Sequence, residues 1–194
     1  MLAFVIFVFA VAGMIKGTIG LGLPAVSMGL LSLVISPFQA ATLLIIPSMV
    51  TNFWQLFAER RVMRLVQRFW PLLVGMIIGS VWSVFPTLGH GEFQSEALLG
   101  GMLAIYGLYG LFAKNMPNLA PYEKYLSPIM GYLGGALTVA TGVVVIPVVP
   151  YLQSLHLKRD DLVQSLGLAF TVSTLCLAVY LHLNPVEDTP IDYQ

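Results

Sequence analysis

The stretch KGTIGLGLPAV, residues 16–26, places a lysine, three glycines and a proline within a region that is otherwise almost entirely apolar. Lys16 is the one charged residue in positions 1–36. A single α-helix of 36 residues would be about 54 Å long, whereas the hydrocarbon core of a bilayer is about 30 Å thick. The stretch must therefore be interrupted, either as a discontinuous or re-entrant helix or as two tightly joined spans.

Residues that interrupt helices lie where this length requires them. Relative to alanine, glycine costs about 1 kcal/mol in a helix interior and proline about 3 kcal/mol. The first break is predicted at Gly17, Gly20, Gly22 and Pro24. Backbone groups freed at membrane depth are tolerated only where protein buries them or a wet cavity faces them. We therefore expect the first helix to break where its backbone is needed for binding.

A second charge-poor stretch, residues 125–155, is also too long for one span. Both stretches contain a Gly-xxx-Gly step, at Gly13/Gly17 and Gly131/Gly135, and both lead through a break into a helix rich in Ser and Thr. Interrupted segments at corresponding places in two halves indicate a transporter's binding site. The residues predicted to interrupt the second stretch are Gly134, Gly135, Gly142, Pro147 and Pro150.

Composition identifies an integral membrane protein. The 194 residues are 58% hydrophobic and 9% charged, with a mean hydropathy of +0.87, whereas soluble domains are about 25% charged. The zero net charge argues against binding to nucleic acid, and the lipid bilayer is the expected partner. The single Cys176 excludes an intramolecular disulfide.

The sequence contains no pattern typical of a catalytic or metal-binding site. No carboxylate pair, Ser/His/Asp set or phosphate loop is present, so an enzyme is not expected. The three histidines, His90, His156 and His182, do not have the spacing of metal ligands. Neither a metal nor a cofactor is predicted.

The predicted fold class is an all-α integral membrane protein with six apolar stretches, forming six to eight helices in two related units with broken helices. The first unit is residues 1–115 with four stretches, the second is residues 125–183 and is shortened, and residues 184–194 form a polar tail. The apolar stretches are at about 1–36, 39–57, 69–87, 97–113, 125–155 and 162–183.

Basic residues predict the orientation, because lysine and arginine concentrate in cytoplasmic loops. Loop 58–68 holds four arginines, loop 114–124 holds two lysines, and loop 88–96 holds neither. We therefore expect loops 58–68 and 114–124 to be cytoplasmic and loop 88–96 to lie outside the cell, in a multi-pass protein of the inner or plasma membrane.

The side of the two chain ends is left open by the sequence. If each long stretch crosses once, both ends are cytoplasmic and Lys158 and Arg159 lie outside. If each crosses twice, both ends are outside and these two basic residues lie inside.

Lys16 has two interpretations. A charge at the centre of a bilayer costs about 2.5–3.5 kcal/mol on insertion scales, and such residues usually face a cavity or pathway. Beside a helix break, its ammonium and the free backbone N–H groups would attract an anion. Alternatively, Lys16 lies at the end of a span and extends to the lipid headgroups. The second break offers Thr138 and Thr141 in the corresponding region and no charge.

The glycines also have two interpretations, since small residues let helix backbones approach closely. Close packing is the expected role of Gly75 and Gly79. At Gly20, Gly22 and Gly142 a proline follows within five residues, and there a broken helix is expected.

The sequence resembles the sulfite exporter TauE/SafE family of bacterial membrane transporters. The resemblance is based on GTIGLGLPAVSMGLLSLVISPFQAATLLIIPSMVTNFWQLF with the following AERR, residues 17–61, and on a second copy formed by GGALTVATGVVVIPVVP and LVQSLGLAFTVSTLCLA. It extends over about residues 8–182. Members usually have denser glycine runs at the breaks and about eight helices in two units of four, whereas the second unit here lacks the last two.

The resemblance implies a secondary transporter of small anions, sulfur-containing or organic acids. Its site would lie at the paired breaks, and homo-oligomers are compatible with it. The alternative is a non-transporting, shortened member acting as a helix-packing or accessory component. The expected substrate-binding residues are Lys16, Gly17, Gly20, Gly22, Pro24, Thr138, Thr141, Gly142 and Pro147.

Overall fold

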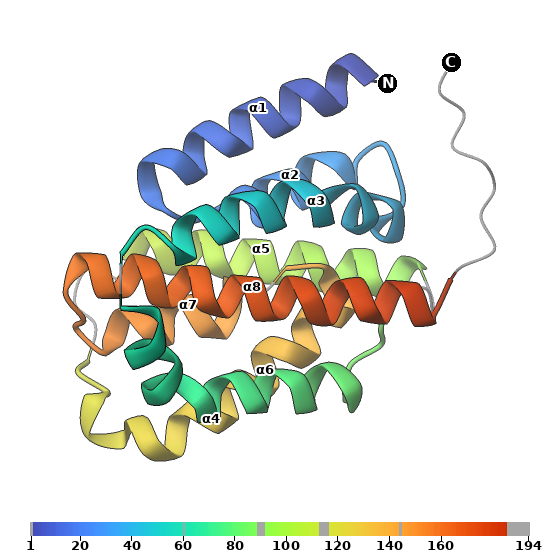
Figure 1. Ribbon diagram of the computed structural model, residues 1–194. Helices are drawn as coiled ribbons and strands as arrows, with labels where there is room; N and C mark the ends of the chain where they lie inside the picture. The colour runs from blue at the N-terminus through green and yellow to red at the C-terminus, as the bar shows by residue number, and fades with distance from the viewer. Residues whose placement is uncertain (1, 60, 89–91, 113–116, 144, 186–194) are drawn as a thin grey trace.

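The computed structural model describes residues 2–59, 61–88, 92–112, 117–143 and 145–185, and this part of the chain is helical without strands (Figure 1). The predicted all-α class is confirmed. The helices are α1 Leu2–Ile19, α2 Leu23–Leu31, α3 Pro37–Leu56, α4 Val62–Val81, α5 Glu92–Phe112, the 3-10 helix η1 Ala120–Tyr122, α6 Glu123–Thr141, α7 Val145–Ser154 and α8 Arg159–Leu183.

Three of these helices are long and apolar enough to cross a membrane by length and composition, namely α1, α4 and α8. The six spans and the two related units expected from the sequence remain predictions. The expected tail, residues 184–194, lies almost wholly outside the described residues, as do His90 and Lys114.

The first break lies between α1 and α2. Gly20 and Gly22 have φ angles of +81° and +103°, and Gly22 is the residue before the first turn of α2. This left-handed backbone costs other residues about 1–2 kcal/mol, so both positions favour glycine. Pro24 lies in the first turn of α2, where its missing N–H is not needed. Gly17, by contrast, is inside α1, and its predicted place in the break is wrong, because an isolated glycine is tolerated within a helix.

The second break is centred on Gly142, with φ +73°, at the end of α6. Ile146 is extended, with φ −108° and ψ 135°, as expected for a residue before proline, so the helical part of α7 effectively starts at Pro147. Gly134 and Gly135 lie inside α6 and Pro150 inside α7. The prediction that these three residues interrupt the stretch is therefore wrong.

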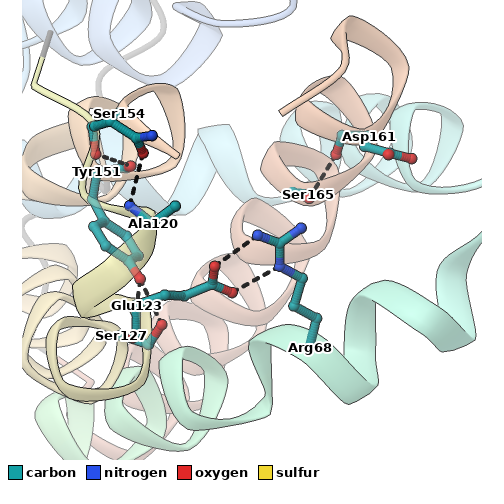
Figure 2. A network of polar contacts seen from close by, with 9 residues as sticks. Arg68, Ala120, Glu123, Ser127, Tyr151, Ser154, Asp161 and Ser165 are labelled. Carbon is teal, nitrogen blue, oxygen red and sulfur yellow. Dashed lines mark hydrogen bonds and ion pairs between the residues drawn. The ribbon is translucent and has the colours of Figure 1, made fainter. Parts of the chain in front are cut away.

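One end of the helix bundle gathers the basic residues and is called the basic end here. Arg61 forms an ion pair with Asp161 at 3.0 Å, next to the exposed Lys158 and Arg159. Arg68 forms two hydrogen bonds with Glu123 at 2.8 and 2.7 Å (Figure 2). The starts of α4, α6 and α8 therefore lie at the same end.

The opposite end is defined by Leu88. Its N–H donates to the Val139 carbonyl at 2.9 Å near the end of α6, and its own carbonyl accepts from the Tyr180 hydroxyl near the end of α8 at 3.1 Å. The first turn of α1 also lies at this end (Figure 1). Each long stretch thus runs to one end of the bundle and turns back. This arrangement agrees with the alternative in which each long stretch crosses twice and both chain ends lie on the side opposite Lys158 and Arg159.

Helices α4 and α6 pack through glycines on both sides of their contact. A Cβ atom on Gly79 would collide with the Tyr132 carbonyl, and one on Gly135 would collide with the Met76 carbonyl. A Cβ atom on Gly75 would likewise collide with the Pro128 carbonyl, and one on Gly131 would collide with the Leu72 carbonyl. The packing role predicted for Gly75 and Gly79 is confirmed, and the backbone contact explains why α6 retains Gly135 despite its low helix propensity.

We expect Gly79→Ala to destabilise the protein by about 1–3 kcal/mol, because the added methyl group must push α4 and α6 apart. The measurement is the melting temperature of the purified protein in detergent. Gly100→Ala on α5 is the matched control, since a Cβ there has no neighbour within 4 Å. It should leave the melting temperature unchanged or raise it, because alanine favours the helix. Equal melting temperatures for the wild type and Gly79→Ala would contradict the packing role.

Candidate functional site

Lys16 points into the protein, with only 6% of its surface exposed. Its ammonium donates to the Thr51 hydroxyl at 3.0 Å and to the Asn52 side-chain carbonyl. It also lies 5.6 Å from the centre of the Phe170 ring, a favourable cation–π geometry. This burial does not agree with a lysine that extends to the headgroups, whose charged end would lie in water.

The positive charge of Lys16 has no carboxylate partner within the described part of the chain. The two ion pairs there, Arg61–Asp161 and Arg68–Glu123, both lie at the basic end and use other cations. A buried charge without a counter-charge has a desolvation cost of several kcal/mol. An anion bound next to Lys16 would offset this cost, so the site is suited to anion binding.

The partners of Lys16 come from one polar stripe on α3. Ser48, Asn52 and Gln55 are all buried, and their spacing of four and three residues places them on one face of the helix. Thr51 adjoins the stripe and completes the contact with Lys16. The Ser- and Thr-rich character of this helix is evident in the sequence, but Asn52 and Gln55 were not among the predicted site residues. The helical spacing of polar residues within an apolar segment could have identified them.

A cavity of about 480 Å³ lies between α1, α3 and the start of α8. A Cβ on Gly13 or Gly17 would meet no heavy atom within 4 Å, so these glycines leave room instead of packing against a helix. The volume is ample for a small anion. The lining residues are Gly13, Lys16, Gly17, Gly20, Val50, Thr51, Trp54, Gln55, Ala58 and Val163.

Gln55 fixes the first break to α8. Its amide nitrogen donates to the Gly20 carbonyl at 3.0 Å and to the Val163 carbonyl at 2.9 Å. These bonds satisfy a carbonyl that the end of α1 leaves without a helical partner, as the interior of a membrane requires. Gln164 makes the reverse contact, donating from α8 to the carbonyls of Leu56 and Glu59.

A second, much smaller space of about 10 Å³ lies between the first turn of α2 and the end of α6. It is lined by Pro24 from α2 and by Thr138 and Gly142 from the end of α6, with Leu44, Ile45, Phe170, Ser173, Thr174 and Leu177 from α3 and α8. A Cβ on Gly142 would lie 2.9 Å from the Met28 methyl group, so α2 and the end of α6 are in close contact. This space is called the break junction here.

The remaining predicted site residues are farther from these two spaces. The Thr141 hydroxyl is buried and donates to the Leu137 carbonyl at 2.7 Å, and Pro147 is half-buried. Neither lines the cavity or the break junction. Gly22 borders another cavity, of about 290 Å³, beside α5. The structure thus brings Lys16, Gly17 and Gly20 together in one place and Pro24, Thr138 and Gly142 in another.

The described residues contain no group of three or more His, Cys, Asp or Glu side chains that could hold a metal ion.

The family model described as Sulfite exporter TauE/SafE matches residues 5–190, nearly the whole chain. Comparisons with curated proteins and with solved structures gave no match.

We expect Gln55→Leu to loosen the first break, because the Gly20 carbonyl loses its hydrogen bond. An unsatisfied buried carbonyl costs about 1–3 kcal/mol, which predicts hydrogen exchange of the amides in residues 18–24 that is faster by about fivefold to a hundredfold. Exchange is measured by mass spectrometry on protein in lipid nanodiscs. The matched control, Gln164→Leu, should accelerate exchange near Leu56 and leave residues 18–24 unchanged. If both variants affect residues 18–24 equally, Gln55 is not the specific support of the break.

Proposed function

The chain belongs to the sulfite exporter TauE/SafE family, whose members are membrane transporters and not enzymes, and on this premise we propose that it is a secondary transporter of small anions. Its substrates are sulfur-containing anions such as sulfite, or small organic acids. The substrate site lies at the two broken helices. The observation that carries the proposal is the buried Lys16 ammonium, which borders a cavity and has no carboxylate partner among the described residues.

The chemistry around Lys16 supports reversible binding. Its hydrogen bonds go to a neutral hydroxyl and a neutral amide, so the charge is solvated but not neutralised. An anion can therefore bind to Lys16 without first breaking an ion pair. When the anion leaves, the ammonium keeps its two neutral hydrogen-bond partners. A transporter needs this balance, since its substrate must both bind and depart.

The arrangement of the breaks supports two related units of opposite orientation. Helix α1, of 18 residues, runs toward the basic end and is followed by the nine-residue α2, whereas α6, of 19 residues, runs away from it and is followed by the ten-residue α7. Helices α3 and α8 follow the breaks and pack together (Figure 1). Inverted repeats with broken helices at their interface are common in secondary transporters. We assign the units to residues 1–115 and 125–183.

The basic end is proposed to face the cytoplasm of a cell in whose inner or plasma membrane the protein resides. Loop 58–68 and the described part of loop 114–124 lie at this end together with Lys158 and Arg159. Their common position agrees with the preference of positive residues for the cytoplasmic side.

Flux into proteoliposomes tests the transport function. Purified protein is reconstituted, and uptake of radiolabelled sulfite and of a small carboxylate is followed with and without a pH gradient. We expect protein-dependent uptake that decreases at least tenfold in Lys16→Ala, equivalent to a loss of about 1.4 kcal/mol of stabilisation. The matched control is Lys158→Ala, which removes the same charge from an exposed position at the basic end and should retain uptake.

Two outcomes would contradict parts of the proposal. If neither anion is taken up although the reconstituted protein is folded, as shown by its melting temperature, the transport function is contradicted and a helix-packing or accessory role is favoured. Normal flux in Lys16→Ala would contradict the counter-charge role of Lys16 and leave transport intact.

Orientation is tested with single cysteines introduced into a Cys176→Ala background in intact cells. A membrane-impermeant maleimide should label Ser83→Cys, at the opposite end, and should label Lys158→Cys only after the cells are permeabilised. The reverse pattern would place the basic end outside.

A further inference from the structure

We propose that the break junction is a second binding position for the transported anion, that Thr174 is its hydrogen-bond donor, and that Phe170 and Asn52 form the wall between this position and the Lys16 cavity. This inference rests on the proposed transport function and adds residues of α3 and α8 to a site so far assigned to the two breaks.

Phe170 contacts a residue that lines the larger cavity and itself lines the smaller space. The Lys16 ammonium lies 5.6 Å from the centre of its ring, and its side chain borders the break junction. The side chain is 1% exposed and does not line the Lys16 cavity itself. The ring therefore lies between a cavity of about 480 Å³ and a space of about 10 Å³. The smaller space can hold about one water molecule, so the structure is closed at the junction and open at Lys16.

Asn52 connects the same two spaces through hydrogen bonds. Its side-chain carbonyl accepts from Lys16, and its amide nitrogen donates to the Thr174 hydroxyl at 3.1 Å. Asn52 is fully buried and lines neither space. Its amide is fixed in this orientation, because the reverse orientation would turn its N–H groups toward the Lys16 ammonium.

Thr174 offers an unused donor at the break junction. Its oxygen accepts from Asn52, and within the described part of the chain its own hydrogen has no acceptor. The other two hydroxyls of the junction are already occupied: Thr138 donates to the Gly134 carbonyl at 2.7 Å and Ser173 to the Phe170 carbonyl at 3.0 Å. A small oxyanion that reaches the junction would accept from Thr174, and rotation of the Phe170 ring would provide the volume.

The two positions would then have complementary roles. Lys16 supplies charge where the cavity is open, and Thr174 supplies a neutral donor at the break junction, between the first turn of α2 and the end of α6. Asn52 is hydrogen-bonded both to Lys16 and to Thr174, the residues that would bind the anion at the two positions. An anion that passes Phe170 would therefore stay close to polar groups. Movement of one aromatic side chain would change which position is accessible.

Cysteine accessibility tests the wall without requiring transport. Thr174→Cys is introduced into a Cys176→Ala background, and its reaction with the small anionic reagent methanethiosulfonate ethylsulfonate is timed in detergent-solubilised protein. We expect slow labelling with Phe170 present and at least tenfold faster labelling with Phe170→Ala. Thr51→Cys, which lines the Lys16 cavity, should react rapidly in both backgrounds and shows that the reagent enters the cavity.

Phe69→Ala is the matched control for the loss of a ring. Phe69 on α4 is also 1% exposed, but it lines neither the cavity nor the break junction. This variant should leave the labelling of Thr174→Cys slow. If Phe170→Ala does not fold, Phe170→Leu serves in its place, and an intermediate rate is expected. Rapid labelling in the presence of Phe170, or equal rates for the Phe170→Ala and Phe69→Ala proteins, would overturn the proposed wall.

Occupancy of the second position is tested with sulfate as the protecting ligand, because this oxyanion reacts neither with thiols nor with the labelling reagent. The reporter is Ser173→Cys, which also lines the break junction and leaves Thr174 in place. In the Phe170→Ala protein, saturating sulfate should slow the labelling of Ser173→Cys at least threefold, whereas sodium chloride at the same ionic strength should not. Protection of Thr51→Cys alone would mean that the anion binds at Lys16 only, and would overturn the second position. The transport function would fail separately, through absence of flux in liposomes.

Discussion

A backbone that breaks inside a membrane must satisfy its freed polar groups within the protein, because the hydrocarbon offers no hydrogen bonds. This constraint explains the pairing of α3 and α8. Gln55 on α3 holds the Gly20 carbonyl at the first break and the Val163 carbonyl on α8. The next polar group along α3, Asn52, holds the Lys16 ammonium and Thr174. The break, the buried charge and the contact between α3 and α8 thus share one short polar stripe.

Glycine has three different roles in this chain, and they are distinguished by what surrounds each Cβ position. Gly79 and Gly135 allow α4 and α6 to touch through their backbones. Gly22 and Gly142 adopt the left-handed backbone that ends one helix and starts another. Gly17 does neither and leaves open space beside Lys16. The Gly-xxx-Gly steps of α1 and α6 look alike in sequence. The step in α1 lines a cavity, whereas the step in α6 packs directly against the backbone of α4.

The asymmetry between the two proposed units has a functional consequence. The first break supplies a charged residue and an open cavity, and the second supplies hydroxyl groups and close packing against Met28. A transporter with two such unequal halves would hold an anion strongly near the basic end and weakly at the break junction.

The sequence by itself determined the membrane environment, the all-helical class and the approximate places of both breaks, because composition, length and the glycine and proline costs act locally. The family was identified from the resemblance of the motifs around the two breaks. It also identified Lys16 as unusual, since a charge in an apolar stretch is visible without coordinates. Only the tertiary structure decided which residues meet. Asn52, Thr174 and Phe170 are ordinary members of apolar helices, and their importance arises from contacts between distant parts of the sequence, such as the 122 positions between Asn52 and Thr174. The same is true of Gly17 and Gly135, because whether a glycine packs or opens a space depends on the neighbouring helix and not on its own chemistry.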